Sequence, residues 1–235
     1  MRRMMWIVAG LLVIGLPLAA VAMGNRGESI DFKEAKLRVE INATDGDAGL
    51  QIDLDHEPWQ WVRLETPDGR LVLDVRNRGV LKDYGLTELF SESSEPPFTE
   101  FPLDEFKQLF PEGEYVFTGK EVGGARMRST FALSHDFPAG PEILSPEEEA
   151  TVSGEGLVIE WDPGDQPAGV EIVRYQVLVI SEDDPGRELS LFMPAEARSL
   201  AIPSEFATPG EYKTEVLAIE ESGNQTLTEV AFIIE

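Results

Sequence analysis

Four aspartates near residue 50 are the residues in this chain best placed to bind a metal ion. Asp45 and Asp47 lie in a glycine-rich stretch that predicts a turn, and Asp53 and Asp55 lie on the strand predicted to follow it. Calcium takes about six to eight oxygen ligands, often from carboxylates one residue apart. The spacing lacks the third ligand, the glycine and the final glutamate of an EF-hand loop. The four aspartates are therefore either a calcium site or solvated turn and strand residues, and no other cofactor is expected.

Two tryptophans on the next apolar stretch offer a second kind of chemistry. Trp59 and Trp61 are two positions apart, which in a strand places both side chains on one face. An exposed pair would form a flat platform on which a sugar ring can stack. A buried pair would instead fill a hydrophobic core. Exposure of the two rings decides between a glycan site and core packing.

The chain offers few residues to a catalytic mechanism. His56 and His135 are the only histidines, and neither lies in a nucleophile-elbow or zinc-protease motif. Cysteine is absent, which excludes thiolate catalysis and thiolate metal sites. With 44 acidic residues, a pair of carboxylates at glycosidase spacing is no evidence for such an enzyme. We expect a protein that is not an enzyme.

The N-terminus indicates export. Arg2 and Arg3 precede an uncharged apolar stretch over residues 4–23, which contains the small-x-small triplet Ala20-Val21-Ala22. This pattern predicts a signal peptide over residues 1–22 that is cleaved after Ala22. The stretch is also long enough to stay in the bilayer as an anchor. We expect a periplasmic or extracellular protein, either free after cleavage or anchored in the membrane through residues 4–23.

Charge narrows the possible partners. The chain has 19 basic and 44 acidic residues and a net charge of -25, which becomes -27 (17 minus 44) once Arg2 and Arg3 are removed with the signal. Such a surface repels nucleic acid and anionic membranes, so we expect no nucleic-acid partner and no membrane contact other than through an uncleaved N-terminal segment. The acidity fits either solubility or a cationic partner. A hydrophobic fraction of 42% is typical of a folded chain.

Alternating residues predict a β-rich first domain over residues 35–138, after a flexible leader over residues 23–34. Turn-forming stretches at residues 42–49, 66–70 and 123–124 separate apolar-alternating runs and predict three hairpins. Between residues 81 and 110 the sequences LTELF and LDEFKQLF are spaced like short helical turns. The acidic connection over residues 83–119 is either a solvated surface or a docking surface for something cationic.

A proline-rich linker over residues 135–141 separates the first domain from a second β-domain. Two prolines and a glycine in this stretch are incompatible with a helix or a central strand. Its shortness predicts a restricted angle between the domains. Six strands are predicted after it. They cover residues 157–161, 172–180, 188–193, 199–202, 212–219 and 227–234.

Three aromatic residues in this second domain carry a family resemblance. Trp161 ends the strand LVIEW, Tyr175 lies in VRYQVLVI, and Tyr212 follows a Pro-Gly turn in PGEYKTEVLAIEESGN. Residues 141–235 therefore resemble a fibronectin type III module, a small antiparallel β-sandwich. The resemblance implies that Trp161 and Tyr175 pack in the core and that Tyr212 is the corner tyrosine, with its hydroxyl bonded back to nearby backbone. The stretch from Pro-Gly to tyrosine is one residue short, which also fits a related bacterial immunoglobulin-like module.

Together these features predict an all-β protein of two antiparallel β-sandwich domains preceded by a signal-peptide helix. The first domain reads like the uncharacterised β-domains of bacterial exported proteins. The expected function is non-enzymatic binding, adhesion or assembly at the bacterial cell envelope, with a protein or glycan partner. The alternative is a carbohydrate-binding or accessory module associated with glycan-degrading enzymes, with or without stabilisation by calcium. Ligand, oligomeric state and pathway are not encoded in any motif.

Overall fold

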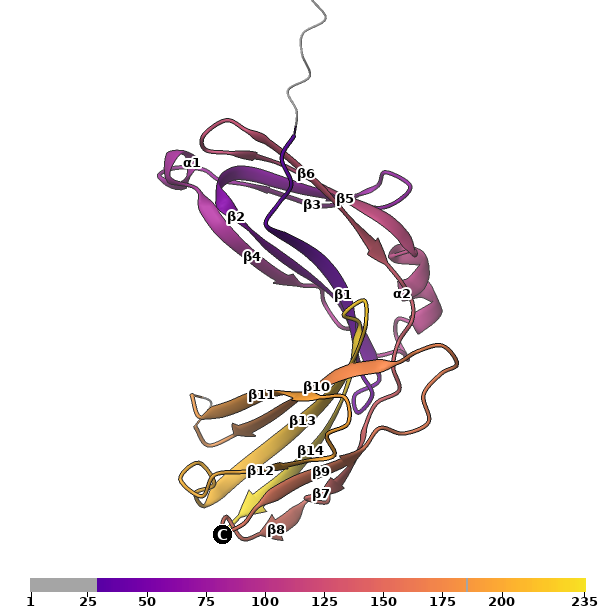
Figure 1. Cartoon of the computed structure of the whole chain (residues 1–235), viewed down its shortest axis with the longest axis vertical. Coiled ribbons are helices and arrows are strands. Elements are labelled where there is room, and N and C mark those ends of the chain that lie inside the picture. Colours follow the sequence, from indigo (N-terminus) through magenta and orange to yellow (C-terminus); the bar gives the residue numbers. More distant parts are fainter. Residues whose placement is uncertain (1–28, 185) are drawn as a thin grey trace, which may run out of the picture.

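The computed structural model describes residues 29–184 and 186–235, and in this part the chain is mostly β-structure in two halves, each with its own hydrophobic core (Figure 1). The predicted signal peptide and its helix lie outside the described residues. No helix within residues 29–184 or 186–235 combines the length and the apolar character that crossing a bilayer requires.

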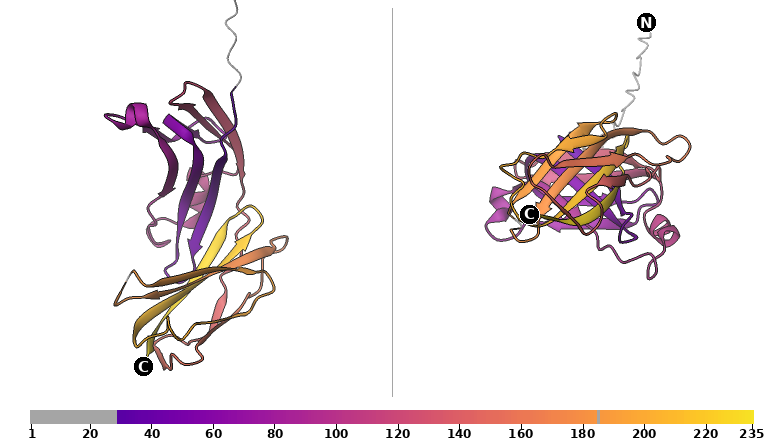
Figure 2. Two further views of the ribbon diagram at one scale, coloured as in Figure 1. Left: turned by 60° about the vertical axis from the view of Figure 1, so that its left-hand side comes forward. Right: turned by 90° about the horizontal axis from the view of Figure 1, so that it is seen from below.

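The first half is one sheet folded over on itself. Its strands are β1 (Glu34–Asn42), β2 (Asp47–Glu65), β3 (Leu71–Arg76), β4 (Leu86–Glu92), β5 (Gly113–Glu121) and β6 (Arg126–Leu133). The three predicted hairpins are present as β1–β2, β2–β3 and β5–β6. The predicted strands before and after residue 56 are one long strand, β2, whose N-terminal part pairs with β1 and β4 and whose C-terminal part pairs with β3 and β5. β2 therefore carries the chain from one layer of the half to the other (Figures 1 and 2).

The connection after β3 contains two short helices and a strand. α1 (Leu81–Tyr84) and α2 (Leu103–Leu109) flank β4. The LDEFKQL sequence is helical, as its spacing predicted, and α2 buries Phe106 in the first core. The prediction of a helical turn at LTELF was wrong, because this sequence forms β4 against β2. A run of five residues is too short to distinguish the apolar repeat of a helix from that of a strand. Pairing with β2 therefore determines that this run is a strand.

The predicted flexible leader ends earlier than residue 34. Ile30 forms a parallel bridge with Met127, and the Phe32 side chain is buried in the first core. Ile30 and Phe32 are too few to establish a period among polar and charged neighbours, so no local pattern predicted that this segment packs.

The second half is a sandwich of a three-stranded sheet and a larger layer of four strands, to which the short β8 (Ala150–Val152) adds by pairing in parallel with the end of β14 (Gln225–Ile234). The smaller sheet has the order β12 (Ser199–Ala201), β9 (Val158–Asp162), β7 (Glu142–Ser145). The larger layer has the order β11 (Glu188–Pro194), β10 (Ile172–Ser181), β13 (Gly210–Glu220), β14 (Gln225–Ile234). The sequence prediction missed β7 and the short β8 (Ala150–Val152), whose runs are too brief to show alternation.

The two halves share a sheet, which the prediction of two separate antiparallel sandwiches did not include. The start of β14 pairs in parallel with the end of β1, in the register Glu40 to Gln225, Ile41 to Thr226 and Asn42 to Leu227. This pairing makes one mixed 11-stranded sheet that runs through the whole molecule. Without this pairing, both strands would expose unpaired backbone N–H and C=O groups there. Each strand therefore supplies hydrogen-bond partners to the edge of the other.

Candidate functional site: the groove between the halves

A turn at residues 222–224 fixes the groove, because it joins β13 to β14 at the point where the halves meet. Gly223 has a φ of 100° there, a conformation that favours glycine. The carboxylate of Glu220 accepts hydrogen bonds from the backbone N–H groups of Ser222, at 2.8 Å, and Asn224, at 2.9 Å. The local sequence thus holds the Asn224 side chain in a fixed position toward the first half.

Asn224 is fully buried and bonds to both halves. Its Oδ1 accepts a hydrogen bond from the Val39 backbone N–H at 2.9 Å. Its Nδ2 donates to the backbone carbonyls of Ser134, at 3.1 Å, and Asp136, at 3.3 Å. One side chain therefore connects β1, the linker and β14, and its exposed fraction is 0%.

Three further contacts reinforce the join. Thr226 Oγ1 donates to the Pro138 carbonyl at 2.6 Å, which ties the linker to β14. Thr44 Oγ1 accepts from the Glu229 backbone N–H at 2.9 Å, and the Ala43 N–H donates to the Leu227 carbonyl at 2.9 Å. Together with the parallel pairing, these bonds hold the halves as one body.

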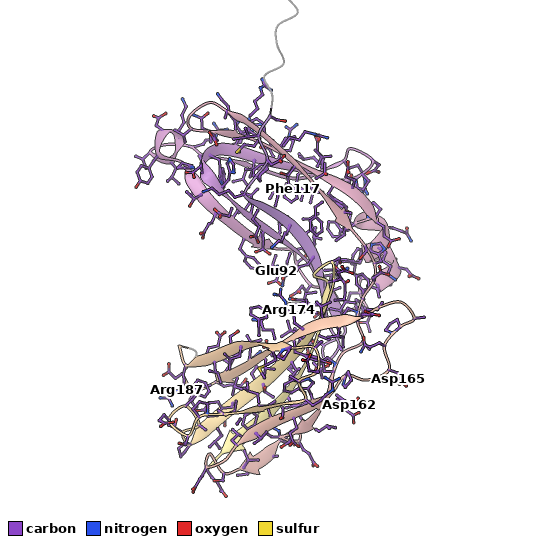
Figure 3. All side chains as sticks on the ribbon, viewed as in Figure 1. Glu92, Phe117, Asp162, Asp165, Arg174 and Arg187 are labelled. Carbon is purple, nitrogen blue, oxygen red and sulfur yellow. The ribbon has the colours of Figure 1, made fainter. Side chains whose placement is uncertain are left out.

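A groove of about 440 Å³ lies between the halves on the concave side of the molecule. Its floor includes Ile219, Ser222 and Gln225, and its walls are β1 and β2 on one side and β10 and β11 on the other. In Figure 3, Glu92 and Arg174 lie on opposite sides of this concave face. The groove volume is within the range of about 300–1,000 Å³ found for ligand pockets.

Exposed apolar side chains stand on one wall of the groove and next to the other. Phe192 of β11 is 59% exposed, and the Arg174 guanidinium lies 4.6 Å from the centre of its ring. Val173 lines the groove beside them and is also exposed. On the first half, Phe90 of β4 is 59% exposed and pairs with Asp53, a groove residue. An aromatic ring with an arginine beside it is the composition typical of binding hot spots.

Three glutamates gather beside the groove. Carboxylate oxygens of Glu40, Glu92 and Glu95 lie within 4.8 Å of one another. Gln51 donates a hydrogen bond to Glu92 at 2.6 Å, and Gln225 donates one to Glu40. Desolvation, followed by the charges of Glu92, Asp47 and Glu40, raises the pKa of Glu95 to about 7.

The chain packs the cluster tightly. Glu95 lies directly over Gly49 of β2, where a Cβ would collide with its carboxylate. Burial raises the pKa of Glu40, against the opposing hydrogen bond from Gln225. Two of the three glutamates come from the acidic connection over residues 83–119, so part of that connection faces the groove.

The four aspartates predicted as a calcium site are not brought together. Asp47 and Asp55 are eight positions apart on one extended strand, which separates their Cα atoms by about 26 Å. Asp53 forms an ion pair with Arg38, and Asp45 accepts a hydrogen bond from Asn42. Within residues 29–184 and 186–235, the carboxylate and histidine groups close enough to share an ion do not include any of the four. An extended β2 prevents the clustering that a loop would have allowed.

The two tryptophans lie on opposite faces of β2, which corrects the shared face expected from their spacing. The register of β2 against β5 shifts between Trp59 and Trp61, and this bulge inserts one extra residue between inward positions. Trp59 is 0% exposed and fills the first core, whereas Trp61 is half-buried on the outer face under the Arg76 guanidinium. The pair therefore does not form a stacking platform.

The remaining singled-out residues have structural contacts. His56 is buried, with Nδ1 accepting from the Lys33 N–H at 3.2 Å and Nε2 lying 3.0 Å from Glu121 Oε1. His135 Nε2 lies 2.8 Å from the Phe110 carbonyl.

The three aromatic residues behind the family resemblance lie in the second core. Trp161 and Tyr175 are buried there with their ring centres 5.4 Å apart, edge to face. The buried Tyr212 donates its hydroxyl hydrogen to the Phe206 carbonyl at 3.3 Å, the bond of a tyrosine corner.

Sequence reasoning missed the residues that build the groove. Asn224 stood out only as a turn residue, although its side chain joins the halves. Phe192 lies in ELSLFMP, where it reads as one more apolar residue of a strand. One signal was present in the sequence. Leu189, Leu191 and Met193 share one face of the strand, so the apolar Phe192 must lie on the opposite face, next to Ser190 and Glu188.

Comparison with known proteins shows similarity of structure only. No family model and no curated protein sequence matches the chain. A crystal structure of the FN1–FN3 domains of chicken CNTN1 aligns with 88% of this chain and 65% of its own, with 9% sequence identity and a TM-score of 0.35. A structure concerned with host cell surface retention of a 1.5-MDa bacterial ice-binding adhesin aligns with 86% and 65%, with 12% identity and a TM-score of 0.28.

This chain thus spans less than two thirds of either structure.

Proposed function

We propose that the protein is a non-catalytic binding module of the bacterial envelope that holds a segment of a partner protein in the groove between its halves. The observation that carries this proposal is Phe192, a 59% exposed aromatic residue beside Arg174 at the mouth of the groove. An exposed phenylalanine on a folded surface leaves apolar area in water, which a partner would remove.

The edge of β11 supports an extended partner segment. β11 pairs with β10 on one side and ends the order of the large sheet, so its other edge carries free backbone N–H and C=O groups. Edge strands of this kind accept an added strand from another protein. Phe192 and Ser190 project from β11 on the groove side, opposite Gln176 and Leu178. A partner strand along β11 would therefore place its side chains beside Phe192.

The domain type and the location are part of the same proposal. We assign residues 141–235 to the fibronectin type III class, with the strand order of the two layers and the Tyr212 corner as support. Export rests on residues 1–22 of the sequence. Cell fractionation followed by N-terminal sequencing tests export: recovery in the envelope, either with a start at Met23 or with residues 4–23 retained as an anchor, supports it, and recovery of the intact chain in the cytoplasm contradicts it.

Site-specific photo-crosslinking in cells tests the groove. A photoreactive phenylalanine analogue is placed at Phe192 and, as a control, at Leu144, which is 50% exposed on the smaller sheet. We expect discrete cross-linked products at residue 192 that are absent at residue 144 and weakened by Arg174→Ala. Equal patterns at both positions, or no product at residue 192, would contradict a binding role for the groove.

The glycan alternative loses its main support, because Trp59 is buried. A calcium role for the four aspartates has no geometric support either, so neither is carried further as a function.

A further inference from the structure

A basic surface lies at the far end of the first half, in a chain whose net charge is -25. The pairing registers place Arg76 of β3, Trp61 of β2, Lys120 of β5 and Arg126 of β6 side by side in one row. Residues paired directly across strands share a face, and the row lies on the outer face because Met127 and Gly119, which alternate with it, are buried. We call this surface the basic end. It consists of Arg76, Arg78, Lys82, Lys120, Arg126 and Arg128.

Most of these cations are free to bind an external anion. Among the ion pairs within residues 29–184 and 186–235, only Arg76 of the six takes part, with Asp74 at 2.9 Å. The acidic neighbours Glu57 and Glu121 are held by Lys33 and His56. Asp31, which follows Ile30, and Asp83 of α1 are further carboxylates nearby, and the six cations outnumber them. The basic end is therefore locally positive.

Apolar side chains stand beside the cations. A hollow of about 380 Å³ brings Lys82 of α1 next to Trp61, Arg76 and Arg78. Within and just before α1, Val80 is 87% exposed, Tyr84 82% and Leu81 38%. A soluble polyanion would recognise the cations but leave these side chains in water. The interface of a bilayer accommodates both, since aromatic and aliphatic side chains enter the headgroup region while lysine and arginine bind anionic lipids.

The chain itself enters at this end. The Ile30 N–H donates to the Arg126 carbonyl, and the Arg128 N–H donates to the Ile30 carbonyl, both at 2.9 Å. Figure 1 shows the first described residues, α1 and the β5–β6 hairpin at the same end of the molecule. The apolar stretch over residues 4–23 ends seven positions before Ile30, and seven residues span at most about 25 Å. A bilayer that holds this stretch lies within that distance of the basic end.

We propose that the basic end docks on a membrane surface rich in anionic lipid headgroups, beside the point where the N-terminal segment leaves the fold. The acidity of the rest of the molecule does not prevent this, because charges are screened over about 8 Å at physiological salt. Docking would orient the molecule with the groove held away from the lipid surface. The proposal does not depend on the groove having a partner.

Quenching of Trp61 by brominated lipids tests the proposal with the full chain. A Trp6→Phe background removes the tryptophan of the apolar stretch, and Trp59 and Trp161 are buried in the two cores. Vesicles contain brominated phosphatidylcholine either alone or with about 30% phosphatidylglycerol. We expect quenching in the anionic vesicles only, with its loss at about 1 M salt, and loss of the signal in Trp61→Phe identifies its source.

Paired variants locate the surface. Arg78→Gln with Lys82→Gln should weaken the docking that Trp61 quenching reports in anionic vesicles at least about tenfold, because each cation near such a surface contributes roughly fivefold. Lys36→Gln with Lys107→Gln makes the same charge change elsewhere and should leave binding unchanged. Equal quenching in neutral vesicles, no quenching in anionic ones, or equal effects of the two pairs would overturn the proposal. Preferential binding of a soluble polyuronate over vesicles would overturn it as well.

Discussion

The two hydrophobic cores of this chain are built around one tryptophan each but are closed in different ways. The second core lies between two separate sheets, where Trp161 packs against Tyr175. The first core lies inside one sheet that folds over along β2, where Trp59 sits next to a bulge. The second half can close its core alone, whereas the first shares an edge of its sheet with β14. The join between the halves is therefore part of the first half's architecture.

Emptying the second core should give the largest effect. We expect Trp161→Ala to cost about 3–5 kcal/mol of unfolding free energy, the usual range for truncating a large buried aromatic. Chemical denaturation of the full chain measures this loss. A loss below about 1 kcal/mol would mean that the second core is not organised around Trp161.

Removing the amide at the join should give the next largest effect. Asn224→Ala leaves the buried Val39 N–H and two linker carbonyls without their partner, and we expect a cost of about 1–3 kcal/mol. We also expect the first half to unfold before the second, since the first loses the support of β14. Glu221→Ala, which changes the same turn at an exposed position, is the matched control. A single unchanged transition in Asn224→Ala would show that the halves do not depend on this join.

The glutamates beside the groove should make stability depend on pH. The pKa of Glu95 is raised in the folded chain, from 4.5 to about 7, so the folded state keeps a proton that the unfolded state has lost. The contribution of Glu95 to the free energy of unfolding is therefore fully present below about pH 4.5 and is lost as the pH rises to about 7. Because Glu95 is exposed to solvent, we expect only about 1 kcal/mol over this window.

Glu95→Gln should flatten this decline, and denaturation at several pH values measures it. An identical slope in Glu95→Gln would assign the pH dependence to other groups. Glu88→Gln, on the same wall but outside the cluster, is expected to behave like the parent chain.

The smallest effect is expected at the groove mouth. Phe192→Ala should change the unfolding free energy by less than about 0.5 kcal/mol, because its ring is largely exposed and supports neither core. Differential scanning calorimetry compares it with Trp161→Ala. A large loss of stability would make Phe192 a packing residue and remove the basis of the binding proposal.

Much of the strand content was predictable from alternation and turn residues, as at Pro67-Asp68-Gly69 between β2 and β3. The parallel pairing of β1 with β14 was not, because no local pattern encodes contact between residues 185 positions apart. The bulge beside Trp61 was equally hidden, and one inserted residue was enough to reverse the expected facing of the tryptophans. The groove depends on both kinds of information, so its residues could be assigned only from the fold.

Chain entry at the basic end was hidden for a related reason. The predicted leader contains Phe32, whose burial depends on the space between β2, β5 and β6 and not on its neighbours in sequence. The negative net charge of the chain likewise gave no indication that the basic end is locally positive.

The central claim is that the two halves form one body with a fixed groove, and electron spin resonance tests it most directly. The chain has no cysteine, so Glu88→Cys on β4 and Glu188→Cys on β11 place two spin labels on the two sides of the groove without competing sites. We expect one narrow distance distribution that Asn224→Ala broadens. A broad distribution in the parent chain, or one that Asn224→Ala leaves unchanged, would contradict the claim.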